Sequence, residues 1–145
     1  CPTSNLFLGS GLFPLKKTWD QQVKVGLGTD IGAGTSFSLL QTVNEAYKVQ
    51  QLQGDKLSAY ESLYHATLGG AKALDLDDKL GNFTVGKEAD FVVLDLKETA
   101  LQQLRQSRAK SIEDSLFALF TMGDDRNIEA TYIYGQKAYQ QNQSI

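Results

Sequence analysis

Asp30 is the residue of this sequence that is best placed to carry chemistry. It follows an apolar stretch, residues 23–27, and a Gly28-Thr29 turn, and the glycine-rich loop behind it allows a sharp bend and close approach to a ligand. A carboxylate at the end of a strand can bind a divalent metal ion and accept a proton from water that the metal activates. The alternative is a polar turn in which Asp30 only hydrogen-bonds locally or caps a helix. The spacing alone favours that simpler alternative.

A metal site needs further ligands, and the sequence offers few. His65 is the only histidine and Cys1 the only cysteine, so a complete zinc site with the usual nitrogen and sulfur ligands cannot be built from this chain alone. His65 falls within a predicted helix, where a lone histidine is more often a surface or hydrogen-bonded residue than a ligand. Cys1 would be a nucleophile only beside an activating base, and the sequence identifies none. Asp124, Asp125 and Arg126 are better explained as a solvated turn with a local ion pair than as a paired-carboxylate site.

The composition argues against several classes of function. The chain has 145 residues, the size of one compact domain, and a formal net charge of -3. This charge gives no electrostatic reason to expect nucleic acid or an anionic membrane as a partner, and no apolar run approaches the roughly 18 residues that span a bilayer. One cysteine cannot form an internal disulfide framework, which predicts a reducing compartment and hence a cytoplasmic location. The abrupt start at Cys1, without an initiator methionine, predicts a piece of a longer protein.

The first half of the sequence predicts a strand, a loop and two helices in that order. Residues 23–27 predict a strand buried on both faces, as in a parallel sheet. A helix is expected over residues 37–53, capped by Ser36 and with Phe37 in its buried stripe. The Ser58-to-Glu61 spacing is that of a capping box, which predicts the start of a second helix. The buried face of this second helix is expected to carry Tyr60, Leu63, Tyr64 and Thr67.

The second half of the sequence predicts a small β layer with attached helices. A strand is expected at residues 91–94, a surface helix within 97–111, and an amphipathic helix from Ser111 to Gly123. Residues 128–139 predict two strands joined by a tight turn. The glutamine-rich tail, residues 140–145, is expected to fray.

Four segments resemble the amidohydrolase superfamily in its metal-dependent deaminase branch, and they follow one another in family order: residues 1–11, 26–30, 66–74 and 81–90. The second segment is similar to the GxGTD motif at the end of the eighth barrel strand. The fourth resembles the GKxAD-containing signature with which the chain leaves the barrel for a β-sandwich. The resemblance implies an α/β fold, with the C-terminal part of a (β/α)8 barrel over residues 1–78 and part of a small β-sandwich domain with attached helices over 79–145.

Two further segments, residues 30–38 and 122–128, are similar to deaminases of purines within this branch. The resemblance implies hydrolytic deamination by zinc-activated water, with one zinc ion per full-length subunit held by upstream histidines and by Asp30. Asp30 would then be a metal ligand, a substrate-binding residue and the catalytic proton carrier, and the substrate would be a small-molecule purine. A homodimer is implied for the full-length enzyme.

The resemblance and the residue count lead to expectations for the isolated chain. We expect it to be inactive, not to bind zinc tightly, and to self-associate through the exposed apolar edge of strand 23–28. Two alternatives stay open. One is that the parent enzyme acts on another amino- or chloro-heterocycle; the other is that the chain is a non-catalytic interaction module.

Overall fold

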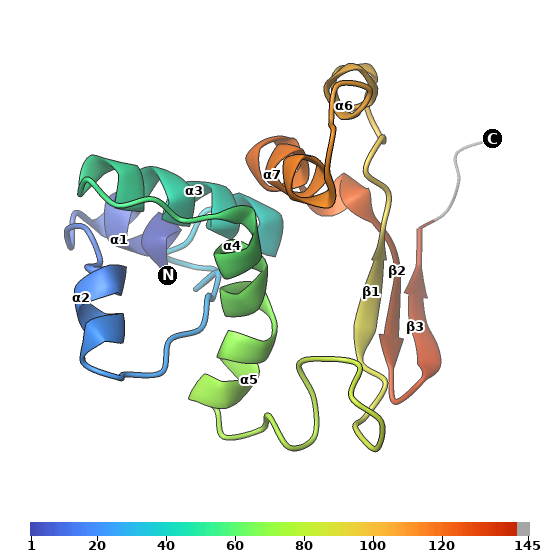
Figure 1. Ribbon diagram of the computed structural model, residues 1–145, viewed down its shortest axis with the longest axis horizontal. Coiled ribbons are helices and arrows are strands. Elements are labelled where there is room, and N and C mark those ends of the chain that lie inside the picture. Colours follow the sequence, from blue (N-terminus) through green and yellow to red (C-terminus); the bar gives the residue numbers. More distant parts are fainter. Residues whose placement is uncertain (142–145) are drawn as a thin grey trace.

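The structure is a computed structural model that describes residues 1–141. Helices α1 to α5 lie on one side of the molecule and a three-stranded sheet on the other, with α7 between them (Figure 1). The expected fraying of the tail does not begin at Gln140, because Gln140 is the last residue of the third strand. Residues 142–145 of the predicted tail lie outside the described part. The elements in chain order are α1 Pro2–Leu8, α2 Leu15–Asp20, α3 Leu39–Leu52, α4 Ala59–Ala66, α5 Leu68–Ala73, β1 Phe91–Leu94, α6 Ala100–Gln106, α7 Ile112–Met122, a short 3-10 helix η1 Asp125–Asn127, β2 Ile128–Ile133 and β3 Gln136–Gln140. No helix within residues 1–141 is long and apolar enough to cross a bilayer.

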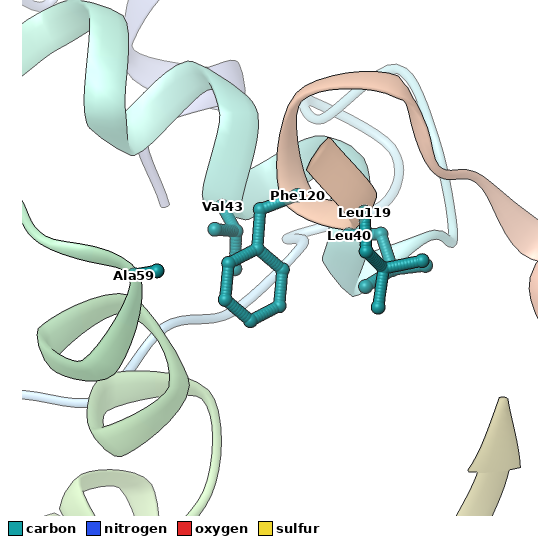
Figure 2. Close-up of a cluster of buried hydrophobic side chains, with 5 residues drawn as sticks. All are labelled: Leu40, Val43, Ala59, Leu119 and Phe120. Carbon is teal, nitrogen blue, oxygen red and sulfur yellow. The ribbon is translucent and has the colours of Figure 1, made fainter. Parts of the chain in front are cut away.

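The main hydrophobic core joins helices from both halves of the sequence. Figure 2 shows side chains of three helices meeting in this cluster. Helix α7 comes late in the chain, yet it packs against α3 and α4 and completes their core. Burial of these side chains supplies the main driving force that holds the helices together. The members are Leu40 and Val43 of α3, Ala59 of α4, and Leu119 and Phe120 of α7.

The strand predicted for residues 23–27 does not form in this chain, because the segment pairs with no other strand in the described structure. It is bonded to α4 instead: the Leu27 amide donates to the carbonyl of His65 at 3.1 Å, and the Val25 carbonyl is bonded to the His65 ring. Gly26 lies against Gly70 of α5 so closely that a Cβ atom on Gly26 would be 2.6 Å from the Gly70 Cα. The alternation of apolar residues indicates an extended conformation, but a ladder also requires a neighbouring strand.

Helix α3 begins later than predicted. Ser38 is its cap, with its hydroxyl accepting from the Gln41 amide, while the Ser36 hydroxyl accepts from the Ser38 amide in the preceding turn. Phe37 therefore precedes the helix, and with 81% of its surface exposed it does not belong to the buried stripe. Two serines two residues apart can both act as caps, so the sequence did not distinguish them.

The capping box predicted at the start of α4 is confirmed, but the predicted buried face of this helix is wrong. Tyr60 is 53% exposed and Leu63 is 37% exposed. The buried residues are smaller or more polar, and they recur every third position: Ala59, Ser62 and His65. Small side chains allow α4 to approach its neighbours α3 and α7 closely, and close packing outweighed the hydrophobicity of the larger residues here.

The capping box makes the stability of the chain depend on pH through Glu61. The Ser58 amide donates to the Glu61 carboxylate at 2.8 Å, and hydrogen bonds to the side chain and backbone of Ser58 lower the pKa of Glu61. A carboxylate whose pKa falls on folding stabilises the protein above its ordinary pKa, and this contribution is lost as the pH drops through the lower, folded-state pKa.

We therefore expect Glu61→Gln to lower the melting temperature by about 2 °C at neutral pH. The difference from the wild type should shrink as the pH falls below the ordinary pKa of 4.5. Thermal unfolding followed by circular dichroism between neutral and acidic pH measures this. Glu113→Gln is the matched control, because Glu113 lies in the first turn of α7 without a bond to its cap. A difference that stays constant across the pH range would contradict the assignment.

The strands of the second half form an antiparallel sheet in the order β1-β2-β3, and the predicted hairpin is confirmed. Its two turn residues, Tyr134 and Gly135, both have positive φ, at 55° and 72°. Such turns match the twist of the strands that they join. The tip is tied to the preceding loop, because the Tyr134 amide donates to the Asp90 carboxylate at 2.7 Å and the Gly135 amide donates to the Ala89 carbonyl at 2.9 Å.

A buried polar network links α6 and η1 to the end of β1. Asn127 is completely buried, and its amide donates to the Asp95 carbonyl at 2.6 Å and to the Gln102 side chain at 3.1 Å. Its side-chain oxygen accepts from the Gln102 side chain at 3.1 Å and from the Asp124 backbone amide at 3.0 Å. Gln102 also donates to the carbonyl of Met122, the last residue of α7. The polar turn predicted here is thus a fully bonded junction of four elements.

Lys87 organises the loop that leads from α5 to β1. Its ammonium donates to the carbonyls of Asp77 and Leu80, the latter at 3.3 Å, and the adjacent Glu88 amide donates to the Lys79 carbonyl at 2.8 Å. A charged donor to backbone carbonyls contributes more than a neutral hydrogen bond.

We expect Lys87→Met to lower the free energy of unfolding by about 1–2 kcal/mol, because the two carbonyls lose a charged donor. Urea denaturation measures the change. Lys79→Met removes a lysine from the same loop, where the side chain is exposed and forms no hydrogen bond in the described structure. Equal losses for the two variants would show that the bonds of Lys87 are unimportant.

Candidate functional site

Asp30 lies at the end of the extended segment in a tight loop that exposes its carboxylate. Its backbone is left-handed, with φ of 49°, and its carbonyl accepts from the Gly34 amide at 2.5 Å. A Cβ atom at Gly34 would be 1.9 Å from the carbonyl oxygen of Thr29, so only glycine fits there. The loop therefore holds its shape through backbone contacts and leaves the side chain of Asp30 available to a ligand.

The start of the chain, just before α1, lies close in space to the turn that leads to Asp30. The Cys1 sulfur would be 3.4 Å from a Cβ atom on Gly28, so the first residue of the chain lies beside the turn that precedes Asp30. Cys1 is exposed. The first two of the four segments that resemble family motifs, at the start of the chain and around Asp30, are thus neighbours in space.

The zinc site that the family resemblance implies cannot be completed by the described residues. Within residues 1–141 no group of three or more histidine, cysteine, aspartate or glutamate side chains is arranged to hold a metal ion. The Asp30 carboxylate is a suitable oxygen ligand, but structural and catalytic zinc sites in proteins use at least three protein ligands. The described residues therefore do not fit zinc by themselves, and Asp30 offers one ligand of a larger set.

His65 is not brought together with Asp30 and points to a different role. It is 1% exposed, its Nδ1 is 2.9 Å from the Val25 carbonyl oxygen, and its ring lies 4.7 Å from that of Trp19 between centroids. Its Nε2 is buried and has no hydrogen-bond partner among the described residues. The sequence left a surface position and a hydrogen-bonded one open, and the structure shows a buried, hydrogen-bonded ring. The signal for burial was the spacing of Ala59, Ser62 and His65, three residues apart.

The polar turn around Asp124 and the tyrosines of the sheet serve the structure. The Arg126 guanidinium pairs with the Asp124 carboxylate at 2.7 Å, and this bond lowers the pKa of Asp124, so the predicted local ion pair is confirmed. The ring of Tyr132 stacks on that of Phe91 across the sheet, with 4.5 Å between centroids. The Tyr134 hydroxyl donates to Glu88, and this bond raises the pKa of Tyr134.

Comparison with known proteins defines the class. Residues 1–138 match the sequence model described as the Amidohydrolase family, and the chain belongs to this family. Among characterised relatives it is similar to guanine deaminase of Escherichia coli (strain K12), with 64% identity over 142 residues, which is 98% of this chain and 32% of the relative. The chain thus spans about a third of the length of the curated relatives it matches.

Solved structures agree with this classification. The E. coli guanine deaminase structure superposes with a TM-score of 0.96 over 98% of this chain and 33% of that one. A guanine deaminase from C. acetobutylicum with guanine bound in its active site superposes with a TM-score of 0.79 at 31% identity, over 96% of this chain and 33% of that one. An adenosine deaminase from Xanthomonas campestris with bound zinc superposes with a TM-score of 0.78 at 30% identity. The match covers 94% of this chain and 30% of that one.

Proposed function

We propose that this chain supplies the closing part of a guanine deaminase, which hydrolyses guanine to xanthine and ammonia. The observation that carries the proposal is the 64% identity to a guanine deaminase over nearly the whole chain. The solved relative with guanine in its active site supports the same substrate. Because the chain spans about a third of these relatives, the activity belongs to a longer polypeptide, and the isolated chain is expected to be inactive.

In this proposal Asp30 is a metal ligand, a contact to the substrate and the proton carrier. A zinc ion held by Asp30 and by ligands outside the described residues would supply a water molecule of lowered pKa. Histidines outside the described residues would complete the ligand set, as the family resemblance implies, and the adenosine deaminase relative holds bound zinc. The Asp30 carboxylate accepts the proton of the attacking water and returns it to the amine that leaves. Its exposed position on a loop held by backbone contacts supports this role.

The proposed architecture follows from the same relatives. We infer that residues 1–78 are the last part of a (β/α)8 barrel, with residues 23–27 as its final strand in the full-length enzyme, and that residues 79–145 contribute to a small β-sandwich. The Val25 carbonyl and the Leu27 amide, which both bond to His65 in the arrangement of a parallel-strand neighbour, support the first part. The antiparallel sheet β1-β2-β3 supports the second.

A chimeric enzyme tests the proposed function. This chain would replace the corresponding third of E. coli guanine deaminase, to which it is 64% identical. We expect the chimera to release ammonia from guanine and to form xanthine, while the isolated chain does neither. Assays with adenine, cytosine and a chlorinated triazine test the alternative heterocycles. Preference for one of these, or an inactive but folded chimera, would contradict the proposal.

Assembly and location are part of the proposal. We propose a homodimer for the full-length enzyme and self-association for the isolated chain, since the segment with Val23, which is 49% exposed, has no strand partner in the described structure. A single cysteine is in keeping with a reducing, cytoplasmic environment. Sedimentation velocity measures the assembly, and a monodisperse monomer of the isolated chain would contradict self-association.

A further inference from the structure

His65 holds the extended segment before Asp30 at two points. Its Nδ1 lies 2.9 Å from the Val25 carbonyl oxygen, and its own carbonyl accepts from the Leu27 amide at 3.1 Å. In an extended chain, the carbonyl of one residue and the amide of the second residue after it face the same edge. One residue of a parallel neighbour would donate to the first and accept from the second. His65 therefore makes the two bonds that a residue of a parallel strand would make, although it belongs to a helix.

The geometry determines which nitrogen of His65 carries the proton. A carbonyl oxygen can only accept, so the hydrogen of the bond to Val25 must lie on Nδ1. In the neutral ring Nε2 then has a lone pair, and it meets no hydrogen-bond partner among residues 1–141. The ring is 1% exposed and packs against Trp19, which keeps water from competing for the bond.

We propose that His65 is a positioning residue: its Nδ1–H tautomer replaces a strand neighbour and fixes residues 25–27, and through them the place of Asp30. The effect of His65 on catalysis rests on the proposed function. The attachment of residues 25–27 to His65 is independent of it. The competing explanation is that His65 only fills space in the core, in which case side-chain volume and not a donor at the Nδ1 position would matter.

Two amide variants separate these explanations. The side-chain amide of His65→Asn places an N–H donor close to where Nδ1 lies, whereas His65→Gln carries its amide one carbon further, near Nε2. Glutamine fills more of the space left by the ring than asparagine does. A positioning role therefore predicts that asparagine is the better substitute, and a space-filling role predicts the reverse order.

Nuclear magnetic resonance on the isolated chain tests the attachment directly, because His65 is the only histidine and its ring signals need no assignment. We expect long-range proton–nitrogen correlations to show the Nδ1–H tautomer. Hydrogen exchange of the Leu27 amide should stay within about threefold of the wild type in His65→Asn and accelerate by about tenfold or more in His65→Gln. Unchanged exchange at Ala130 in β2 would show that the variants remain folded. An Nε2–H tautomer, or equal exchange in the two variants, would overturn the proposal.

The chimeric enzyme tests the consequence for Asp30. We expect His65→Gln to lower kcat by about tenfold or more, with a smaller change in KM, and His65→Asn to recover most of the loss. An active chimera in which both variants keep the wild-type kcat would show that the attachment does not position Asp30. An inactive wild-type chimera would contradict the proposed function instead, and the tautomer and exchange measurements would still decide the attachment.

Discussion

Replacing Asp30 with asparagine is expected to lower kcat/KM of the chimeric enzyme for guanine by about a thousandfold or more. Asparagine has the same shape but cannot accept and return a proton, and it is a weaker ligand for a metal ion. It also tolerates the left-handed backbone of Asp30, where φ is 49°. The loop should therefore keep its conformation, and the loss would report on the carboxylate alone. Steady-state release of ammonia from guanine measures the effect, and zinc content measured in parallel reports metal binding.

Asp75→Asn is the matched control for this experiment. Asp75 is the other aspartate with a positive φ, at 54°, and its carboxylate pairs with Lys24 at a position that is 81% exposed. The same chemical change in the same backbone conformation should leave turnover within about twofold of the unsubstituted chimera. Substantial activity in Asp30→Asn would remove Asp30 from the proton transfer and would return it to the structural turn that its sequence spacing alone favours.

Replacing Asn127 with alanine is expected to lower the free energy of unfolding by about 3 kcal/mol. The substitution leaves the Asp124 amide and the Asp95 carbonyl without a partner, and Gln102 keeps only its bonds outside Asn127. Buried polar groups without partners are more costly than the loss of the bonds themselves suggests, because they have also given up water. Urea denaturation monitored by circular dichroism measures the change.

Asn82→Ala is the control for this second prediction. The Asn82 side chain accepts a single bond from the Thr84 amide at an exposed position, where water can replace it. We expect a loss of about 0.5 kcal/mol or less there. A loss at Asn127 no greater than the loss at Asn82 would mean that the network does not join the elements it touches.

The sequence predicted those features of the fold that depend on neighbours along the chain. The capping box of Ser58 and Glu61, the cap at Ser111 and the hairpin after β2 each lie within a few residues, so their types and spacing are sufficient. The buried face of α4 was predicted wrongly, since it depends on how closely α3 and α7 approach. The pairing of Asn127 with Gln102, which are 25 residues apart, has no local signature.

In the candidate site, too, local features could be predicted from the sequence and contacts between distant residues could not. Asp30 became a candidate because a glycine-rich turn after an apolar stretch is visible in the sequence and because this stretch resembles a family motif, and the structure exposes it on such a turn. Its partners in chemistry were not identified, and no metal-binding group is found within the described residues. His65 was weighed as a ligand because of its type, whereas its bond to the Val25 carbonyl depends on a packing arrangement that no sequence spacing encodes.

The contact between Gly26 and Gly70 limits how this protein can change. A Cβ atom at Gly26 would be 2.6 Å from the Gly70 Cα, so the segment that leads to Asp30 and helix α5 touch through backbone atoms. A clash between two side chains can be relieved by shortening either of them, but here neither residue has a side chain to shorten. A mutation at position 26 therefore has no compensating partner at position 70. Only a displacement of the whole helix would restore the fit, and variants at position 26 should be rescued by changes elsewhere in α5 or not at all.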